Sequence, residues 1–315
     1  MTPEEKMAAR VLLRNSLEPP YDLLSLAKKY GDVEYIYFPI TADGVTVGIG
    51  GSERPNILIN ESAPESRQKF TLAHELGHVI IPWHTGIIVS HLNDDGDDYE
   101  YREMESEANR FAAELLIPTA WLIAEYEKFP SFSEYLKHVV NITGASRDAV
   151  LIKIFRSLSA PVVCVEVDVN GRSIHQFRTG NAPQIPALEG RDLKVEKVFK
   201  SNNVFDIFSV GDKLYVSWVF TSIIIEENDP RPWREVLDQI LSDCDAVSIL
   251  KNVNAILPAR YQKCKHLSES EICNSVMHAY EGRDYLENFD KVISHPLFEQ
   301  YVVKRVRELL AKDGR

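Results

Sequence analysis

Residues 70–81 read Phe70-Thr-Leu-Ala-His-Glu-Leu-Gly-His-Val-Ile-Ile81, and this stretch decides how the first half of the chain folds. Side chains four positions apart lie on the same face of a helix, so the imidazoles of His74 and His78 point toward one spot. That arrangement suits two ligands of one zinc ion, Zn2+. Glu75 lies about 100° around the helix, where it can accept a proton from water instead of binding the metal. The pattern therefore predicts a zinc hydrolase, most often a peptidase.

The residues on either side of this stretch predict where its helix begins and ends. Ser62-Ala-Pro-Glu65 has the Ser-x-x-Glu pattern of a capping box, which predicts the start of the helix. Pro82 cannot continue a helix, so the end is expected near Ile81. Within these limits His74 points into the core, where an imidazole needs a partner, and a metal ion supplies one.

A third metal ligand must come from elsewhere, because a catalytic zinc ion takes three protein ligands and keeps one position for water. One candidate is His84, which follows His74 at the spacing of the third histidine in the metzincin pattern. That pattern has a glycine where Ile81 stands here, and the glycine turns the chain toward the metal. His84 is for this reason the weaker candidate.

The stronger candidate is Glu107, on a second predicted helix over residues 99–117 that stops before a proline. The apolar arc of that helix consists of Met104, Ala108, Phe111 and Leu115. Glu107 lies beside this arc, where a carboxylate is costly unless it is paired, and a metal is the obvious pair. Glu103 and Glu105 sit near opposite edges of the arc, and Glu103 and Glu114 are the fallback ligands.

Two motifs carry a resemblance to a known family. They are Thr71-Leu-Ala-His-Glu-Leu-Gly-His78 and Glu105-Ser-Glu-Ala-Asn-Arg-Phe-Ala-Ala-Glu-Leu-Leu-Ile-Pro118. Together they resemble the ImmA/IrrE family of bacterial metallopeptidases. The similarity covers about residues 5–158. It includes Pro19–Gly31, which resembles the family's helix before its small sheet, and Asn56–Asn60, which resembles the strand that leads into the motif helix.

The resemblance implies a gluzincin-like site and a biological role. In such a site His74 and His78 bind Zn2+, Glu75 is the general base, and Glu107 is the third ligand. The implied partner is a helix-turn-helix transcriptional repressor, whose cleavage switches on stress-response or mobile-element genes. Peptide hydrolysis also needs a second group that stabilises the oxyanion. The candidates for it are His84, His91, Tyr99 and Tyr101.

Composition agrees with a cytoplasmic enzyme, at 44% hydrophobic and 26% charged residues. The first residues carry acids where a signal peptide carries positive charge, and no stretch approaches the ~18 apolar residues of a membrane span. The four cysteines form no Cys-x-x-Cys pair, which favours reduced thiols in the cytosol. A formal charge of −12 disfavours direct binding of nucleic acid and suits a substrate with a basic surface.

The 315 residues are enough for two domains, and we expect an α+β fold. Residues 1–130 are the predicted zincin-like metallopeptidase domain, with helices and a small sheet. Residues 131–160 are predicted to form a helix-turn-helix-like segment, for which packing is favoured over DNA contact because the chain is acidic. Residues 161–315 are predicted to form a C-terminal α+β domain for sensing or substrate recognition, with a β-hairpin at Asn170-Gly171.

An alternative interpretation belongs to a different class of function. The chain can be a non-proteolytic DNA- or ligand-binding regulator in which the zinc site only supports the fold. A fourth protein ligand such as His84 would close the metal and favour the regulator. An open position for water in a cleft would favour the peptidase.

Overall fold

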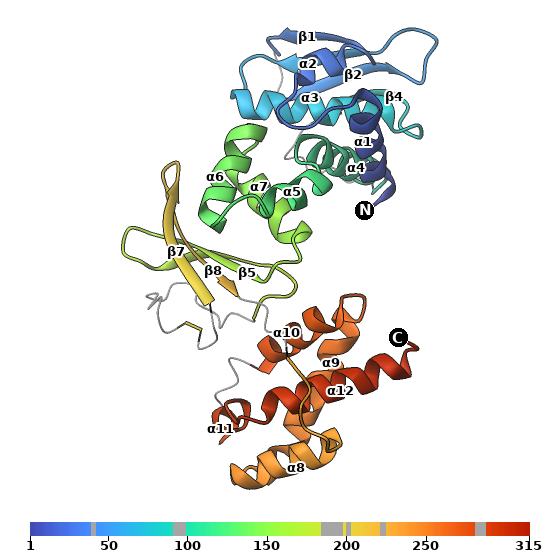
Figure 1. The fold of residues 1–315 in the computed structure, drawn as a ribbon. Helices are drawn as coiled ribbons and strands as arrows, with labels where there is room; N and C mark the ends of the chain where they lie inside the picture. The colour runs from blue at the N-terminus through green and yellow to red at the C-terminus, as the bar shows by residue number, and fades with distance from the viewer. Residues whose placement is uncertain (39–41, 91–98, 184–197, 200–202, 221–224, 281–287) are drawn as a thin grey trace. The chain divides into compact units, whose positions relative to one another are not determined.

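The chain forms two compact units, residues 1–157 and 158–315 (Figure 1). The structure is a computed structural model that describes residues 1–38, 42–90, 99–183, 198–199, 203–220, 225–280 and 288–315, with the side chains of 86–90 and 99–100 left out. Each unit combines helices with a four-stranded sheet, which confirms the predicted α+β class. Among the described helices, none has both the length and the apolar character that crossing a bilayer requires.

The sheet of the first unit lies against the helix that carries the His-Glu-x-x-His motif. Its strands are β1 (Asp32–Ile36), β2 (Gly44–Ile49), β3 (Asn56–Asn60) and β4 (Gly86–Ser90), in the order β1-β3-β2-β4. β1 pairs parallel to β3, and the other pairs are antiparallel. β2 and β3, the central strands, both contact the motif helix, so residues of β2 can reach the catalytic motif.

The motif helix is α3 (Glu65–Ile80), and all its residues from 71 to 78 are buried. It ends before Pro82 as predicted. Its start differs from the prediction, because Pro64 caps it and no side chain accepts a cap hydrogen bond. The backbone N–H of Ser62 donates to Asn60 Oδ1 at 3.0 Å, so Ser62 belongs to the turn after β3 and the capping box does not form.

The second predicted helix is α4 (Tyr99–Leu116), which packs along α3 (Figure 1). The two helices approach closely at Gly77, where an added Cβ atom would lie 3.1 Å from Cδ1 of Phe111. The N-terminal helix α1 (Pro3–Asn15) also packs against α4, and Glu4 and Arg110 form an ion pair there. A short helix, α2 (Leu23–Ala27), leads into β1.

Three further helices complete the first unit, namely α5 (Thr119–Tyr126), α6 (Phe132–Thr143) and α7 (Arg147–Ser157). α6 and α7 are the pair predicted as a helix-turn-helix-like segment. On α7, Lys153 is buried, and its Nζ lies 2.6 Å from Glu114 Oε2 on α4. Glu114 also accepts hydrogen bonds from the backbone N–H and the hydroxyl of Thr119. Lys153 therefore connects α7 to α4 inside the first unit.

We expect Lys153→Met to lower the free energy of unfolding by about 3 kcal/mol, because the Glu114 carboxylate would stay buried without its cation. Arg156→Met, at an exposed position of the same helix, should change it by less than about 0.5 kcal/mol. Urea denaturation of both variants measures the difference. Equal midpoints would contradict the assigned role of the buried pair, whereas recovery on adding Glu114→Gln would support it.

The second unit begins with a sheet that is antiparallel throughout. Its strands are β5 (Val162–Val167), β6 (Ser173–Arg178), β7 (Asn203–Val210) and β8 (Lys213–Phe220), in the order β6-β5-β8-β7. The predicted hairpin at Asn170-Gly171 joins β5 to β6, and Gly171 adopts a φ of +76° that suits glycine in such a turn. The core of this sheet includes Val165 and Trp218.

Helices follow the sheet and form their own apolar core, which includes Tyr301 and Val306. They are α8 (Trp233–Asp243), the 3₁₀ helix η2 (Val247–Ile249), α9 (Leu250–Cys264), α10 (Glu269–Tyr280), α11 (Phe289–Ile293) and α12 (Phe298–Lys312). All four cysteines of the chain are buried free thiols in this unit. Cys264 lies in α9 and Cys273 in α10, where both contribute to the helical core.

Candidate metal centre

Two histidines of α3 and one glutamate of α4 converge on a single point. The Nε2 atoms of His74 and His78 are 3.0 Å apart. The two carboxylate oxygens of Glu105 lie 3.2 Å from His74 Nε2 and 3.3 Å from His78 Nε2. Both imidazoles are fully buried, and the Glu105 side chain is 14% exposed. Two imidazoles and one carboxylate are a ligand set that catalytic zinc sites use.

The electrostatics of the cluster also fit a cation. Burial raises the pKa of Glu105, but hydrogen bonds from His74 and His78 outweigh it and lower that pKa to about 2. Burial lowers the pKa of His78 to about 4. At neutral pH Glu105 is therefore charged and His78 neutral, which are the forms that bind metal. Burial lowers the pKa of His74, but the carboxylates of Glu105 and Glu75 raise it by more. The negative charge of these carboxylates therefore favours a cation at this point.

A second residue of α4 orients His74. The Nδ1 atom of His74 lies 3.0 Å from Asn109 Oδ1, an acceptor, so Nδ1 carries the ring proton and Nε2 keeps its lone pair. Asn109 follows Glu105 by one helical turn, and both face α3. α4 thus supplies the proposed ligand Glu105 and also Asn109, which orients the ring of His74.

Glu107, the predicted third ligand, does not reach this cluster. Its Oε2 lies 2.9 Å from His84 Nε2 and accepts a hydrogen bond from Trp83 Nε1 at 2.6 Å. The physical reason is the width of the buried face of α4. Ala112 and Leu116 are buried as well, and at about 100° per residue they extend that face toward Glu105 and away from Glu107.

The other predicted candidates also lie outside the ligand set. Glu103 is exposed and pairs with Arg110, and Glu114 pairs with Lys153. His84 faces His78 through Nδ1 and lies outside the cluster that His74, His78 and Glu105 form among the described residues. Of the four predicted candidates for oxyanion stabilisation, His84 and Tyr101 have described side chains, and those of His91 and Tyr99 lie outside the described ones.

Glu75, the predicted general base, is held by strand β2. Its carboxylate is fully buried, and the Thr46 hydroxyl donates a hydrogen bond to Glu75 Oε2 at 2.5 Å. Gly44 lies against the same carboxylate. A Cβ atom at Gly44 would overlap Glu75 Oε1 and lie 2.7 Å from Thr71 Cγ2. Two residues of one strand therefore fix where this carboxylate sits, and neither is part of the motif.

We expect Gly44→Ala to reduce peptide cleavage by about 100-fold, because the new methyl group displaces the Glu75 carboxylate by a fraction of an ångström or more. Bound metal should stay at the wild-type level, since no proposed ligand moves. Gly180→Ala is the matched control, because nothing lies within 4 Å of a Cβ atom there. Kinetics together with metal analysis measure both effects, and wild-type activity in Gly44→Ala would contradict the assigned close contact.

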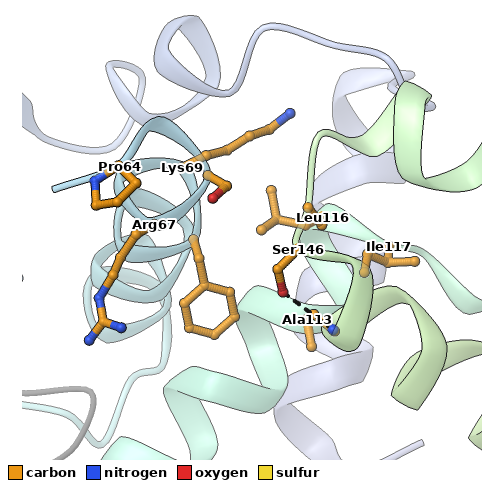
Figure 2. Close-up of a pocket in the computed structure, with 11 residues that line it drawn as sticks. Pro64, Arg67, Lys69, Ala113, Leu116, Ile117 and Ser146 are labelled. Carbon is orange, nitrogen blue, oxygen red and sulfur yellow. Dashed lines mark hydrogen bonds between the residues drawn. The ribbon is translucent and has the colours of Figure 1, made fainter. Parts of the chain in front are cut away.

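An apolar pocket lies one helical turn from the cluster, with a volume of about 430 Å³ (Figure 2). Phe70 lines it, and the Phe70 and His74 rings are 6.4 Å apart between centroids. The charged groups of the lining already have partners, since Lys69 Nζ donates to the Thr143 carbonyl and Arg67 binds Asp43. The rest of the wall is largely apolar and comes from Ala113, Leu116, Ile117, Ala145 and Ala149. Such a lining suits an apolar side chain.

Comparisons with known proteins find similarity to one peptidase family, one curated protein and one solved structure. Residues 25–154, which contain α3 and α4, match the peptidase family described as the IrrE N-terminal-like domain. The radiation response metalloprotease IrrE of Deinococcus radiodurans is 29% identical over 149 residues, which cover 46% of this chain and 43% of that protein. A solved transcriptional regulator of Mycobacterium tuberculosis aligns with a TM-score of 0.38 and 13% identity, over 69% of this chain and 75% of the other.

Proposed function

We propose that this chain is a zinc-dependent endopeptidase, because its residues 25–154 match the peptidase family described as the IrrE N-terminal-like domain. The observation that carries the proposal is the convergence of His74, His78 and Glu105, with the buried carboxylate of Glu75 held beside them by β2. Among the described residues no fourth histidine, cysteine or acid joins the cluster. Three protein ligands are the number typical of catalytic zinc, whereas structural zinc has four.

Each residue of the proposed site has one task. His74, His78 and Glu105 hold the metal, with Glu105 in place of Glu107. When bound, zinc supplies a Lewis acid that polarises the peptide carbonyl and makes water more acidic. Glu75 accepts the proton of the attacking water and passes it to the leaving amine. The Thr46 hydroxyl keeps the Glu75 carboxylate in one orientation during both transfers.

We infer the class of substrate from charge and from the pocket. A net charge of −12 attracts a protein with a basic surface, which is typical of a helix-turn-helix transcriptional repressor. The apolar pocket beside Phe70 would take an apolar side chain close to the scissile bond. Cleavage of such a repressor would switch on the genes that it controls. The cytoplasm is where this enzyme and this substrate would meet.

Coexpression with helix-turn-helix repressors encoded near the gene tests this proposal. We expect one new N-terminus in one repressor, mapped by mass spectrometry, with an apolar residue next to the cut. The purified zinc-loaded chain should cleave the same bond, and a chelator should stop it reversibly. A zinc-loaded chain that cleaves none of these repressors, with or without the stress signal, would favour the non-proteolytic regulator.

A further inference from the structure

A series of side-chain contacts leads from His78 away from the proposed metal. His78 Nδ1 lies 2.9 Å from His84 Nδ1, and His84 Nε2 lies 2.9 Å from Glu107 Oε2. Trp83 Nε1 donates to the same oxygen of Glu107 at 2.6 Å. The contact between His78 and His84 is buried, the contact between His84 and Glu107 is partly buried, and the contact between Trp83 and Glu107 is exposed. These contacts connect His78, a proposed metal ligand, to Glu107, the acid that the sequence predicted as a ligand.

We propose that Glu107 and His84 are positioning residues that fix the tautomer and ring orientation of His78. The inference rests on the metal site proposed above. A carboxylate only accepts hydrogen bonds, so His84 must donate to Glu107 from Nε2. His84 Nδ1 then has a lone pair and accepts a hydrogen bond from His78 Nδ1. His78 Nε2 is left without a proton, and its lone pair points at Glu105 and His74.

The short segment after α3 builds this arrangement. Pro82 ends the helix, and the backbone N–H of His84 donates to the Ile81 carbonyl at 3.1 Å in a tight turn. The turn brings His84 back under His78, with ring centroids 4.9 Å apart. We call the series His78–His84–Glu107 the relay. Trp83 donates a hydrogen bond to its Glu107 end and is itself 47% exposed. The sequence Ile-Pro-Trp-His therefore places both the relay histidine and the indole donor.

The two proposed histidine ligands thus have outer partners of different strength. His74 donates to Asn109, a neutral amide. His78 donates through His84 to a carboxylate, and hydrogen bonds to a charged acceptor are about twice as strong as neutral ones. Outer partners of this kind raise the basicity of the ligand ring, and their loss costs about 10- to 100-fold in metal affinity. Glu107 should therefore matter to metal binding without touching the metal.

Zinc affinity of the full chain, measured by competition with a chromophoric chelator, tests the proposal. We expect Glu107→Ala to weaken zinc binding by about 10- to 100-fold, and Glu107→Gln, which keeps an acceptor oxygen, to weaken it less. Glu103→Ala is the matched control, four residues earlier on α4 with a side chain 52% exposed, and should change the affinity less than about 2-fold. Nitrogen chemical shifts of the ring atoms should report a changed His84 tautomer only in Glu107→Ala.

Glu105→Ala, measured beside these variants, separates the relay from the metal site. If Glu105→Ala binds zinc with the wild-type affinity, the proposed metal site is wrong, and the positioning role that rests on it is wrong as well. If Glu105→Ala abolishes binding while Glu107→Ala behaves like Glu103→Ala, the site stands and the relay is overturned. If Glu107→Ala loses as much affinity as Glu105→Ala, Glu107 is a ligand and the positioning role is overturned.

Discussion

Glu75→Gln should keep its zinc and lose at least about 1000-fold in the rate of peptide cleavage, because an amide cannot accept the proton of the attacking water. Glutamine has the size of glutamate, so it fills the space beside Gly44. Its carbonyl oxygen can still accept the Thr46 hydroxyl, so the fold and the proposed ligands should stay as they are. Single-turnover cleavage and zinc analysis on the same preparation measure the two properties separately.

The control for this variant is Glu65→Gln, which makes the same chemical change at an exposed position of α3. It should cleave at the wild-type rate. If Glu75→Gln also cleaved at that rate, another group would be the general base. If it lost zinc together with activity, Glu75 would act in holding the site and its catalytic role would have no support.

Glu105→Ala should weaken zinc binding by at least about 1000-fold, which is the loss expected when one of three protein ligands is removed. Two buried imidazoles with their Nε2 atoms 3.0 Å apart would then hold the metal without a negative charge to balance it. Equilibrium dialysis or chelator competition measures the loss, and cleavage should disappear with the metal. Excess zinc should restore part of the activity, because Glu75 and its contacts to β2 are untouched.

The ranking of Glu105 against Glu107 is the part of this prediction that matters most. In the structure Glu105 contacts both His74 and His78. Glu107 contacts His84 instead. Glu105→Ala should therefore cost far more affinity than Glu107→Ala. The reverse order would contradict the ligand set and return Glu107 to the role that the sequence suggested for it.

Local sequence signals were sufficient for the elements that carry the site. Pro82 and Pro118 end α3 and α4 where the missing backbone N–H predicts. The spacing of His74 and His78 places both rings on one helix face, and their Nε2 atoms meet as expected. Asn170-Gly171 forms the predicted hairpin. Each of these features depends on a few neighbouring residues, which is why the sequence alone could indicate them.

The remaining features depend on contacts between segments far apart in the chain. The choice between Glu105 and Glu107 follows from how α4 is rotated against α3, and four apolar residues defined too narrow an arc to fix that rotation. Thr46 and Gly44 hold Glu75 across the sheet–helix interface, and nothing in their local sequence indicates it. The start of α3 was missed because Ser62 forms a turn with Asn60 instead of a cap.

Anomalous diffraction at the zinc edge, from crystals of the full chain grown with zinc, tests the central claim most directly. We predict one peak in the first unit, bonded to His74 Nε2, His78 Nε2 and Glu105, with its remaining position open to solvent and within reach of Glu75. A zinc ion closed by a fourth protein ligand such as His84, or one bonded to Glu107 in place of Glu105, would contradict the account.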